Sequence, residues 1–283
     1  MKAIEVDIAP SRLDAWLDLD GARSQWRVVI DHLNAINEAE KWRCDVWRRG
    51  FAHLSTFERH VPSPDDLNAW LEPTGWRVSI ADGFVAVDDY QRCHAEKVFP
   101  ICRYVRRARD IDHSPTPDYL HDVLGHLPML FDPRYSQLLQ AWGKLGESIR
   151  PSGADVEMAA SLSHLLDVLD QDHIDPMDAE AGRQRLAEAR RRSNLEPSRF
   201  SRHEKFYTWA IEFGIFGAER DLNLIGAAAL SSAGELQRLI SRQVQLGSFK
   251  HQALQTSVDY TTYQPQMFVS AGFDEYFEVL DSI

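Results

Sequence analysis

The sequence predicts a mainly α-helical protein with a few short β-strands. Along most of the chain, apolar and aromatic residues recur every three or four positions, which places them on one face of a helix. Two short stretches between positions 76 and 87 instead have the residue pattern of short strands. At 283 residues, the length allows either two domains or one large unit with a sizeable core.

The first elements follow from local signals. Residues 11–59 have the helical spacing, as in the run Trp26, Val29, Ile30, Leu33 and Ile36. Ser63 then provides a capping hydroxyl before Pro64, a residue suited to the first helical position. We expect a short helix from this point through Leu71, ended by Pro73 and the glycine at position 75.

The elements that follow are a hairpin and more helices. Residues 76–80 and 84–87 flank an Asp-Gly pair and predict two short strands joined by a turn. Helical spacing returns over 135–142, 156–169 and 206–216. Residues 170–203 are rich in charge and poor in apolar residues, which favours a solvated helix or surface excursion over a binding patch.

Composition limits the partners. Apolar residues make up 44% and charged residues 26%, as in ordinary globular proteins. A net charge of −12 argues against nucleic acid or an anionic membrane, because phosphate contacts need concentrated Lys and Arg. The three cysteines show no disulfide or zinc spacing, and no signal peptide or membrane span is recognisable. We therefore expect a cytoplasmic protein that acts on a small molecule.

Two histidines, His121 and His126, stand five residues apart in SPTPDYLHDVLGHLPML. Helical metal pairs are usually four apart, because five regular helical steps point two side chains in different directions. Joint ligation therefore needs an irregular turn or a helix start, which Thr116, Pro117 and Asp118 favour. The alternative is a pair of ordinary solvated or hydrogen-bonded histidines.

Glu212 is the second unusual position. It is the only charged residue of FYTWAIEFGIF, a run that otherwise reads as buried helix. A buried carboxylate needs a partner or a metal ion. Composition alone leaves open whether Glu212 is a third metal ligand or reaches solvent.

Four separated stretches carry a family resemblance: SPTPDYLHDVLGHLPML, FYTWAIEFGIF, LIGAAALSSAGELQ and YQPQMFVS. In this order they resemble the catalytic domain of the tetrahydropterin-dependent aromatic amino acid hydroxylases, from about Gln25 to about Phe273. The resemblance implies a single iron-binding catalytic domain of that type over 21–283, after an N-terminal segment of residues 1–20. It also implies a stand-alone catalytic unit, a monomer or small homo-oligomer.

The resemblance assigns roles to individual residues. His121, His126 and Glu212 match the two histidines and the carboxylate that bind Fe(II) on one face. Arg106 matches the arginine that holds the substrate carboxylate. The full set implied for substrate binding is Arg106, Ser114, Asp118, Thr208, Trp209 and Ser231. Ser231, together with Glu235, also resembles the residues behind the iron-binding histidines, which orient such ligands.

The pterin region departs from the family pattern at several positions. The residues implied for binding the reduced pterin are Val85, Val87, Tyr90 and Asp122. Tyr90 falls where an aromatic ring stacks on the pterin. Asp122 replaces the usual glutamate, Pro100 replaces a histidine, and Val87 replaces a serine.

Two further differences concern substrate and architecture. Thr208 replaces a bulky aromatic residue, which implies a pocket for a larger or differently oriented ring. The separation between His121 and Glu212 is long for the family, so we expect an insertion within 146–203. Such an insertion is a lid, an interface or inert surface.

The resemblance implies a monooxygenase that uses Fe(II), dioxygen (O2) and a tetrahydropterin such as tetrahydrobiopterin. It would hydroxylate the ring of a phenylalanine- or tryptophan-like amino acid, with the second oxygen atom leaving on the pterin. One alternative keeps the iron chemistry and changes the substrate to a modified amino acid or an aminobenzoate of a specialised biosynthetic pathway. A third hypothesis is a non-catalytic binding homologue, against which the intact metal ligands argue.

Overall fold

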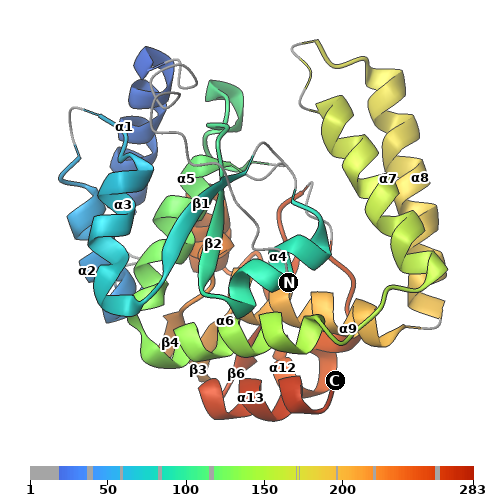
Figure 1. Ribbon diagram of the computed structural model, residues 1–283. Coiled ribbons are helices and arrows are strands. Elements are labelled where there is room, and N and C mark those ends of the chain that lie inside the picture. Colours follow the sequence, from blue (N-terminus) through green and yellow to red (C-terminus); the bar gives the residue numbers. More distant parts are fainter. Residues whose placement is uncertain are drawn as a thin grey trace, which may run out of the picture.

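The computed structural model confirms a mainly helical fold with few short strands (Figure 1). It describes residues 19–36, 41–57, 60–81, 85–114, 118–169, 171, 173–195, 197–218, 221–258 and 262–283. Most of the expected N-terminal segment, residues 1–18, lies outside this range. Within the described part, no helix is both long enough and apolar enough to cross a membrane.

The helices occupy most of the described chain. They are α1 (Leu19–Ala35), α2 (Asp45–Leu54), α3 (Pro64–Leu71), α4 (Val87–Ala95), α5 (Tyr119–His121), α6 (Pro133–Gly146), α7 (Gly153–Leu169), α8 (Pro176–Leu195), α9 (Arg199–Phe206), α10 (Ala227–Ser231), α11 (Ala233–Ile240), α12 (Phe249–Gln252) and α13 (Phe273–Asp281). Two further segments, Asp122–His126 and Tyr207–Glu212, are π-helical. Short 3₁₀ turns lie at Glu72–Thr74 after α3, at Ala108–Asp110, at Leu127–Phe131 after the first π segment, and at Ala253–Gln255 after α12.

The early helices form for the reasons that the sequence gives. Helix α1 buries Trp26, Val29 and Leu33, which share one face through their helical spacing. Ser63 caps α3 by accepting a hydrogen bond from the backbone of Asp66, whose side chain bonds back to the backbone of Ser63. The 3₁₀ turn after α3 ends at a left-handed residue, the glycine at position 75 (φ 73°). The predicted short helix is confirmed.

The strands form two small sheets. Strands β1 (Arg77–Ala81) and β2 (Val98–Cys102) pair in parallel. Strands β3 (Ile215–Ala218), β4 (Asp221–Leu224), β5 (Gln245–Ser248) and β6 (Gln266–Ser270) form the second sheet in the order β4-β3-β6-β5. Only β3 and β4 are antiparallel neighbours there.

The predicted hairpin over 76–87 is wrong. Strand β1 takes the distant β2 as its partner, and Val87 is the first residue of α4. Asp88 and Asp89 lie in the first turn of that helix, where carboxylates favour the positive end of the helix dipole. A run of four apolar residues is too short to separate a strand from a helix start. Residues 82–84 lie outside the described range.

The helix expected over 206–216 is too long at its C-terminal end. The helical part ends at Glu212, and Ile215 begins β3. The chain leaves the helix at Gly214, whose carbonyl accepts hydrogen bonds from the backbone N–H groups of Ile225 and Gly226. A Cβ on Gly214 would lie 2.2 Å from the carbonyl oxygen of Ala210, so only glycine fits.

The charged segment forms most of a helical hairpin made of α7 and α8. Figure 1 shows the two helices side by side at the edge of the molecule, in yellow and yellow-green. Helix α8 buries a narrow stripe against α7: Ala179, Gly182, Leu186, Ala189 and Ser193. A Cβ on Gly182 would lie 3.0 Å from Leu165, so the two helices approach closely. The remaining charged side chains are largely exposed, which confirms a solvated helix.

Candidate metal centre

The segment before the first histidine is fixed by Asp118. Its side chain caps α5 and accepts hydrogen bonds from the backbone N–H groups of Leu120 (2.9 Å) and His121 (3.2 Å). Thr116 and Pro117, expected to open the helix, lie outside the described residues. Because the cap holds the backbone of His121 itself, it also sets the position of that ring.

The backbone conformation explains the unusual spacing of the two histidines. The segment from Asp122 to His126 is π-helical, so its hydrogen bonds span five residues rather than four. The irregular turn predicted for this motif is thereby confirmed. Gly125 lets a neighbouring helix approach this turn, because a Cβ there would lie 2.6 Å from the carbonyl oxygen of Ala227 in α10.

The two histidines and Glu212 meet at one point. Nε2 of His121 lies 3.2 Å from Nε2 of His126. Glu212 completes a triangle, with Oε2 3.3 Å from Nε2 of His121 and Oε1 3.2 Å from Nε2 of His126. Ligand atoms held at right angles about 2.1 Å from one ion would lie about 3 Å apart. The triangle therefore has the size of three ligands on one face of a metal ion.

The outer nitrogen of each ring is held by a hydroxyl group. Nδ1 of His121 lies 3.0 Å from Oγ of Ser231, and that hydroxyl donates to the carbonyl of Ala227 at 2.7 Å. The serine oxygen must therefore accept from Nδ1–H, which leaves the lone pair of His121 on Nε2. Nδ1 of His126 lies 3.2 Å from the hydroxyl of Tyr135. Both rings thus turn Nε2 toward the third ligand.

Burial and charge compete at these groups. Burial alone would raise the pKa of Glu212, but His126 and His121 hold it well below its usual range. Burial alone would lower the pKa of His121, yet the adjacent Glu212 raises it to about 9. Burial lowers the pKa of His126. Without a metal ion, a proton on His121 therefore balances the charge of the Glu212 carboxylate. A bound cation would take over this role.

The chemistry of this donor set is that of a metal centre. Among the described residues, these three form the one group of His, Cys, Asp or Glu side chains placed to hold an ion together. Two nitrogens and one carboxylate on one face leave the other positions for exchangeable ligands. Oε2 of Glu212 is buried and has no hydrogen-bond partner in the described structure. A metal ion would satisfy it.

The sequence matches a known protein family over most of its length. The family model "Biopterin-dependent aromatic amino acid hydroxylase" matches residues 20–165 and 196–282. The chain belongs to this family. The stretch between the two matched parts, 166–195, contains the end of α7 and all of α8.

Relatives of the hydroxylase family cover most of this chain. Phenylalanine-4-hydroxylase of Ralstonia nicotianae is 25% identical over 256 residues, which are 89% of this chain and 67% of that protein. Tyrosine 3-monooxygenase of Homo sapiens is 28% identical over 257 residues, 88% of this chain and 39% of that protein. The chain thus spans about two thirds of the bacterial relative and about two fifths of the human one.

Solved structures show the same fold. Chromobacterium violaceum phenylalanine hydroxylase with bound oxidised Fe(III) has a TM-score of 0.70 and 21% identity, covering 96% of this chain and 82% of its own. The structure of that enzyme with iron(III) and 7,8-dihydrobiopterin has a TM-score of 0.69 and 20% identity, covering 96% and 83%. The hydroxylase-type fold expected from the sequence is confirmed.

The expected carboxylate-binding residues of this hydroxylase-family chain lie beside the metal ligands. Arg106 is buried and pairs with Asp118, with Nε 3.1 Å from Oδ1 and Nη2 3.1 Å from Oδ2. Its Nη1 donates to the carbonyl of Ile111 at 3.2 Å. Asp118 thus connects the guanidinium to the backbone of His121. Ser114 is half-buried in the loop between them.

The expected ring-contacting residues are packed into the core. Thr208 is fully buried, and its hydroxyl donates to the carbonyl of Glu204 at 3.2 Å. Trp209 is also buried, donates to the carbonyl of Thr256 at 3.1 Å and packs edge-on against Phe268. Their substrate contacts stay predictions.

Three of the expected pterin residues, Val85, Val87 and Tyr90, lie at or near the start of α4. Val85 and Val87 are half-buried at its N-terminal end. The hydroxyl of Tyr90 lies 2.7 Å from that of Tyr207, in the π segment that carries Glu212. Asp122 is buried and accepts from the backbone N–H of Cys102 at 2.7 Å, and burial raises its pKa to about 7.

The expected place of Glu235 behind the iron-binding histidines stays a prediction. Its described contacts are the backbone N–H of Gln264, at 3.1 Å, and Nδ1 of His113, at 4.0 Å. Burial raises the pKa of Glu235 to about 7. Ser231, from the same sequence motif, does contact His121. Ser231 and Glu235 are thus four residues apart, and of the two only Ser231 has a described contact with a metal-ligating histidine.

Sequence reasoning missed two tyrosines of the site. Tyr135 contacts His126, and Tyr207 contacts Tyr90. Neither carries a spacing signal, because Tyr135 begins an ordinary amphipathic helix and Tyr207 reads as one apolar residue among many. Their buried hydroxyl groups, which need partners, were the available clue.

Proposed function

We propose that the protein is an Fe(II)- and tetrahydropterin-dependent monooxygenase that hydroxylates the ring of an aromatic amino acid. The observation that carries this proposal is the triangle formed by His121, His126 and Glu212, with edges of 3.2–3.3 Å. Membership of the hydroxylase family supports iron and a biopterin as the groups bound. When bound, they supply the activation of O2, with one oxygen atom going to the ring and one to the pterin.

His121, His126 and Glu212 would hold the iron. The hydroxyl groups of Ser231 and Tyr135 keep the histidine rings turned inward, so the site needs little rearrangement on binding. The side chain of His126 is 1% exposed, whereas those of His121 and Glu212 are 20% and 14% exposed. Access is therefore from the side of His121 and Glu212, which is where substrate and dioxygen would approach.

Arg106 would bind the substrate carboxylate. Its hydrogen bonds to Asp118 and Ile111 use Nε and one hydrogen of Nη1, and Nη2 forms an ion pair with Oδ2 of Asp118 at 3.1 Å. A guanidinium has five N–H donors, so at least one hydrogen remains on each terminal nitrogen. Two such donors match a carboxylate bidentately. The buried partner Asp118 holds the guanidinium plane, which orients a bound amino acid relative to the metal ligands.

Tyr90, Val85, Val87 and Asp122 would form the pterin side of the site. The Tyr90 ring is positioned by its hydroxyl contact to Tyr207, on the same π segment as Glu212. A pterin stacked on Tyr90 would therefore lie next to the metal ligands. Asp122 faces the end of β2, so its contact to the pterin would need a change of partner.

Thr208 favours a second candidate substrate. This small side chain is fully buried one turn before Glu212, at a position where the family usually carries a bulky aromatic residue. A smaller wall leaves room for a larger or differently oriented ring. The second candidate is therefore another aromatic carboxylate, such as a modified amino acid or an aminobenzoate, with the same iron chemistry.

The test is turnover by the iron-loaded protein. Purified protein is loaded anaerobically with Fe(II) and mixed with O2, a reduced tetrahydropterin and a panel of aromatic amino acids and aromatic acids. Mass spectrometry should find one added oxygen on phenylalanine or tryptophan, coupled to pterin oxidation. Pterin oxidation with a product only from another acid selects the second candidate.

Two variants serve as controls for that experiment. His121→Ala and Glu212→Ala should lose both iron retention and turnover. Full coupled activity in either variant, or no iron binding by the wild-type protein, would overturn the proposal and favour a non-catalytic homologue.

A further inference from the structure

In the described part of the chain, the helical hairpin contacts the rest of the protein at its base and at its tip. At its base, Oγ of Ser198 donates to Asp155 at 2.7 Å, and Lys205 donates to Asn194 at 3.0 Å. At its tip, the carbonyl groups of Leu169 and Gln171 accept hydrogen bonds from two arginines. The hairpin therefore spans the molecule from α9 to the loop that follows β2.

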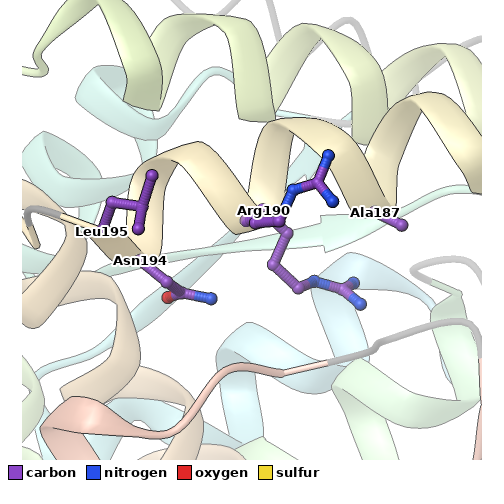
Figure 2. A pocket seen from close by; sticks show the side chains of 5 residues that line it. Ala187, Arg190, Asn194 and Leu195 are labelled. Atoms are coloured by element: carbon purple, nitrogen blue, oxygen red, sulfur yellow. The ribbon is translucent and has the colours of Figure 1, made fainter.

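The C-terminal half of α8 borders a hollow. The hollow along this helix has a volume of about 400 Å³. Figure 2 shows Arg190 and Asn194 projecting from α8 beside it. The hollow is lined by Ala187, Arg190, Arg191, Asn194 and Leu195. Since the C-terminal half of α8 borders this hollow, the tip contacts have a large share in fixing how the hairpin sits.

The tip contacts come from the segment that carries Arg106. Nη1 of Arg107 donates to the carbonyl of Gln171 at 2.7 Å. Nη2 of Arg109 donates to the carbonyls of Leu169, at 3.2 Å, and Gln171, at 3.4 Å. Leu169 is the last residue of α7, where unpaired carbonyl groups and the helix dipole favour cations.

The arginines of this segment divide between two faces. Arg106 is buried and pairs with Asp118, whereas Arg109 is exposed and binds the hairpin. Asp118 in turn accepts from the backbone of His121. A continuous set of contacts thus leads from the hairpin tip through this segment to a metal ligand.

We propose that Arg107 and Arg109 are positioning residues, which fasten the hairpin tip so that the hairpin holds Arg106 in its substrate-binding orientation. This inference rests on the proposed function, which assigns Arg106 to the substrate carboxylate. It gives the chain between 166 and 195, unmatched by the family model, a role in substrate affinity. Rigid placement of a binding group lowers the cost of ordering it on binding.

The test releases the tip and measures two effects. The double variant Arg107→Ala/Arg109→Ala is compared with Arg183→Ala/Arg185→Ala, which removes the same charge from exposed positions of α8. Hydrogen exchange is followed by mass spectrometry in peptides covering 165–171 and 104–112. Calorimetry measures binding of L-phenylalanine to the Co(II)-loaded protein.

We expect faster exchange in both peptides and affinity for L-phenylalanine about tenfold weaker in the first variant, because two or three hydrogen bonds are lost. Affinity for Co(II) should not change, and the control variant should match the wild type in every measurement. Arg109→Lys, which keeps a cationic donor, should recover part of the loss.

Other results would overturn the inference. Faster exchange at 165–171 alone, with unchanged phenylalanine affinity, would show that the arginines only secure the hairpin. Unchanged exchange at both peptides would show that they do not secure it. Exchange is read without turnover. A wild-type protein that hydroxylates no aromatic compound would therefore refute the proposed function, while the exchange comparison would still decide whether Arg107 and Arg109 fasten the hairpin tip.

Discussion

Oγ of Ser231 lies 3.0 Å from Nδ1 of His121 and donates its own proton to the carbonyl of Ala227. The serine thereby fixes both the proton and the orientation of a metal-ligating ring. In Ser231→Ala, the ring loses this partner and we expect affinity for Fe(II) or Co(II) to fall about 10- to 100-fold. Metal titration measures this loss. Ser148→Ala, which removes an exposed hydroxyl, should bind metal like the wild type.

The close approach of α10 to the π turn leads to a second prediction. Gly125→Ala would place a Cβ 2.6 Å from the carbonyl oxygen of Ala227, a backbone atom that cannot simply rotate away. We expect a loss of about 1–3 kcal/mol in the free energy of unfolding, together with weaker metal binding. Gly153→Ala meets nothing within 4 Å and is the matched control. Equal urea midpoints for the two variants would contradict this packing.

Metal binding should strengthen with pH. The pKa of His121 is raised to about 9 in the metal-free protein, so a metal ion must displace a proton from it below that pH. Affinity for Co(II) should therefore rise about tenfold per pH unit between pH 7 and 9 and level off above. Isothermal titration in buffers of different ionisation enthalpy would count the released proton. A flat profile over this range would show that His121 is not protonated.

The stability of the metal-free protein should change in the opposite direction. Because the folded pKa of His121 lies above its unfolded value, its contribution to stability is complete below about pH 6.5 and is lost as pH rises through about 9. Glu212 has a lowered pKa, so its contribution is lost only in acid. Urea unfolding at pH 7 and 9.5 should show this loss. In His121→Ala, the loss over the same interval should be smaller.

Arg106 should affect substrate binding separately from metal binding. Arg106→Lys keeps the charge beside Asp118 but loses the planar pair of donors, so we expect KM for the aromatic substrate to rise about tenfold or more. Co(II) affinity should stay unchanged. Arg183→Lys, at an exposed position of α8, is the control. An unchanged KM would show that the substrate carboxylate binds at another place.

Local signals were enough to predict much of the fold. The cap at Ser63 and the apolar face of α1 depend on residues within a few positions, so their helices follow from the sequence. The partner of β1 depends on a parallel pairing with β2, which no local pattern encodes. Gly214 looked like part of a helix because its role, a close backbone approach, arises only in the folded protein.

The site was predictable to a similar degree. His121 and His126 stood out through their unusual spacing, and Glu212 because a carboxylate is costly to bury without a partner. Their convergence needs two π segments, and the hydrogen bonds of a π helix leave no mark in residue type. Tyr135 and the contacts of Glu235 depend on packing between distant helices, so their places could be read only from the structure.

The metal ligands also lie on two well-separated parts of the chain, with the whole helical hairpin between them. During synthesis, His121 and His126 therefore leave the ribosome several seconds before Glu212, at the usual elongation rate of about 5–20 residues per second. In that interval a nascent chain can offer an ion only two imidazoles, and Ser231 emerges later still. Capture of the metal by all three ligands is thus a late step, which follows the emergence of Glu212 rather than guiding the early folding of the chain.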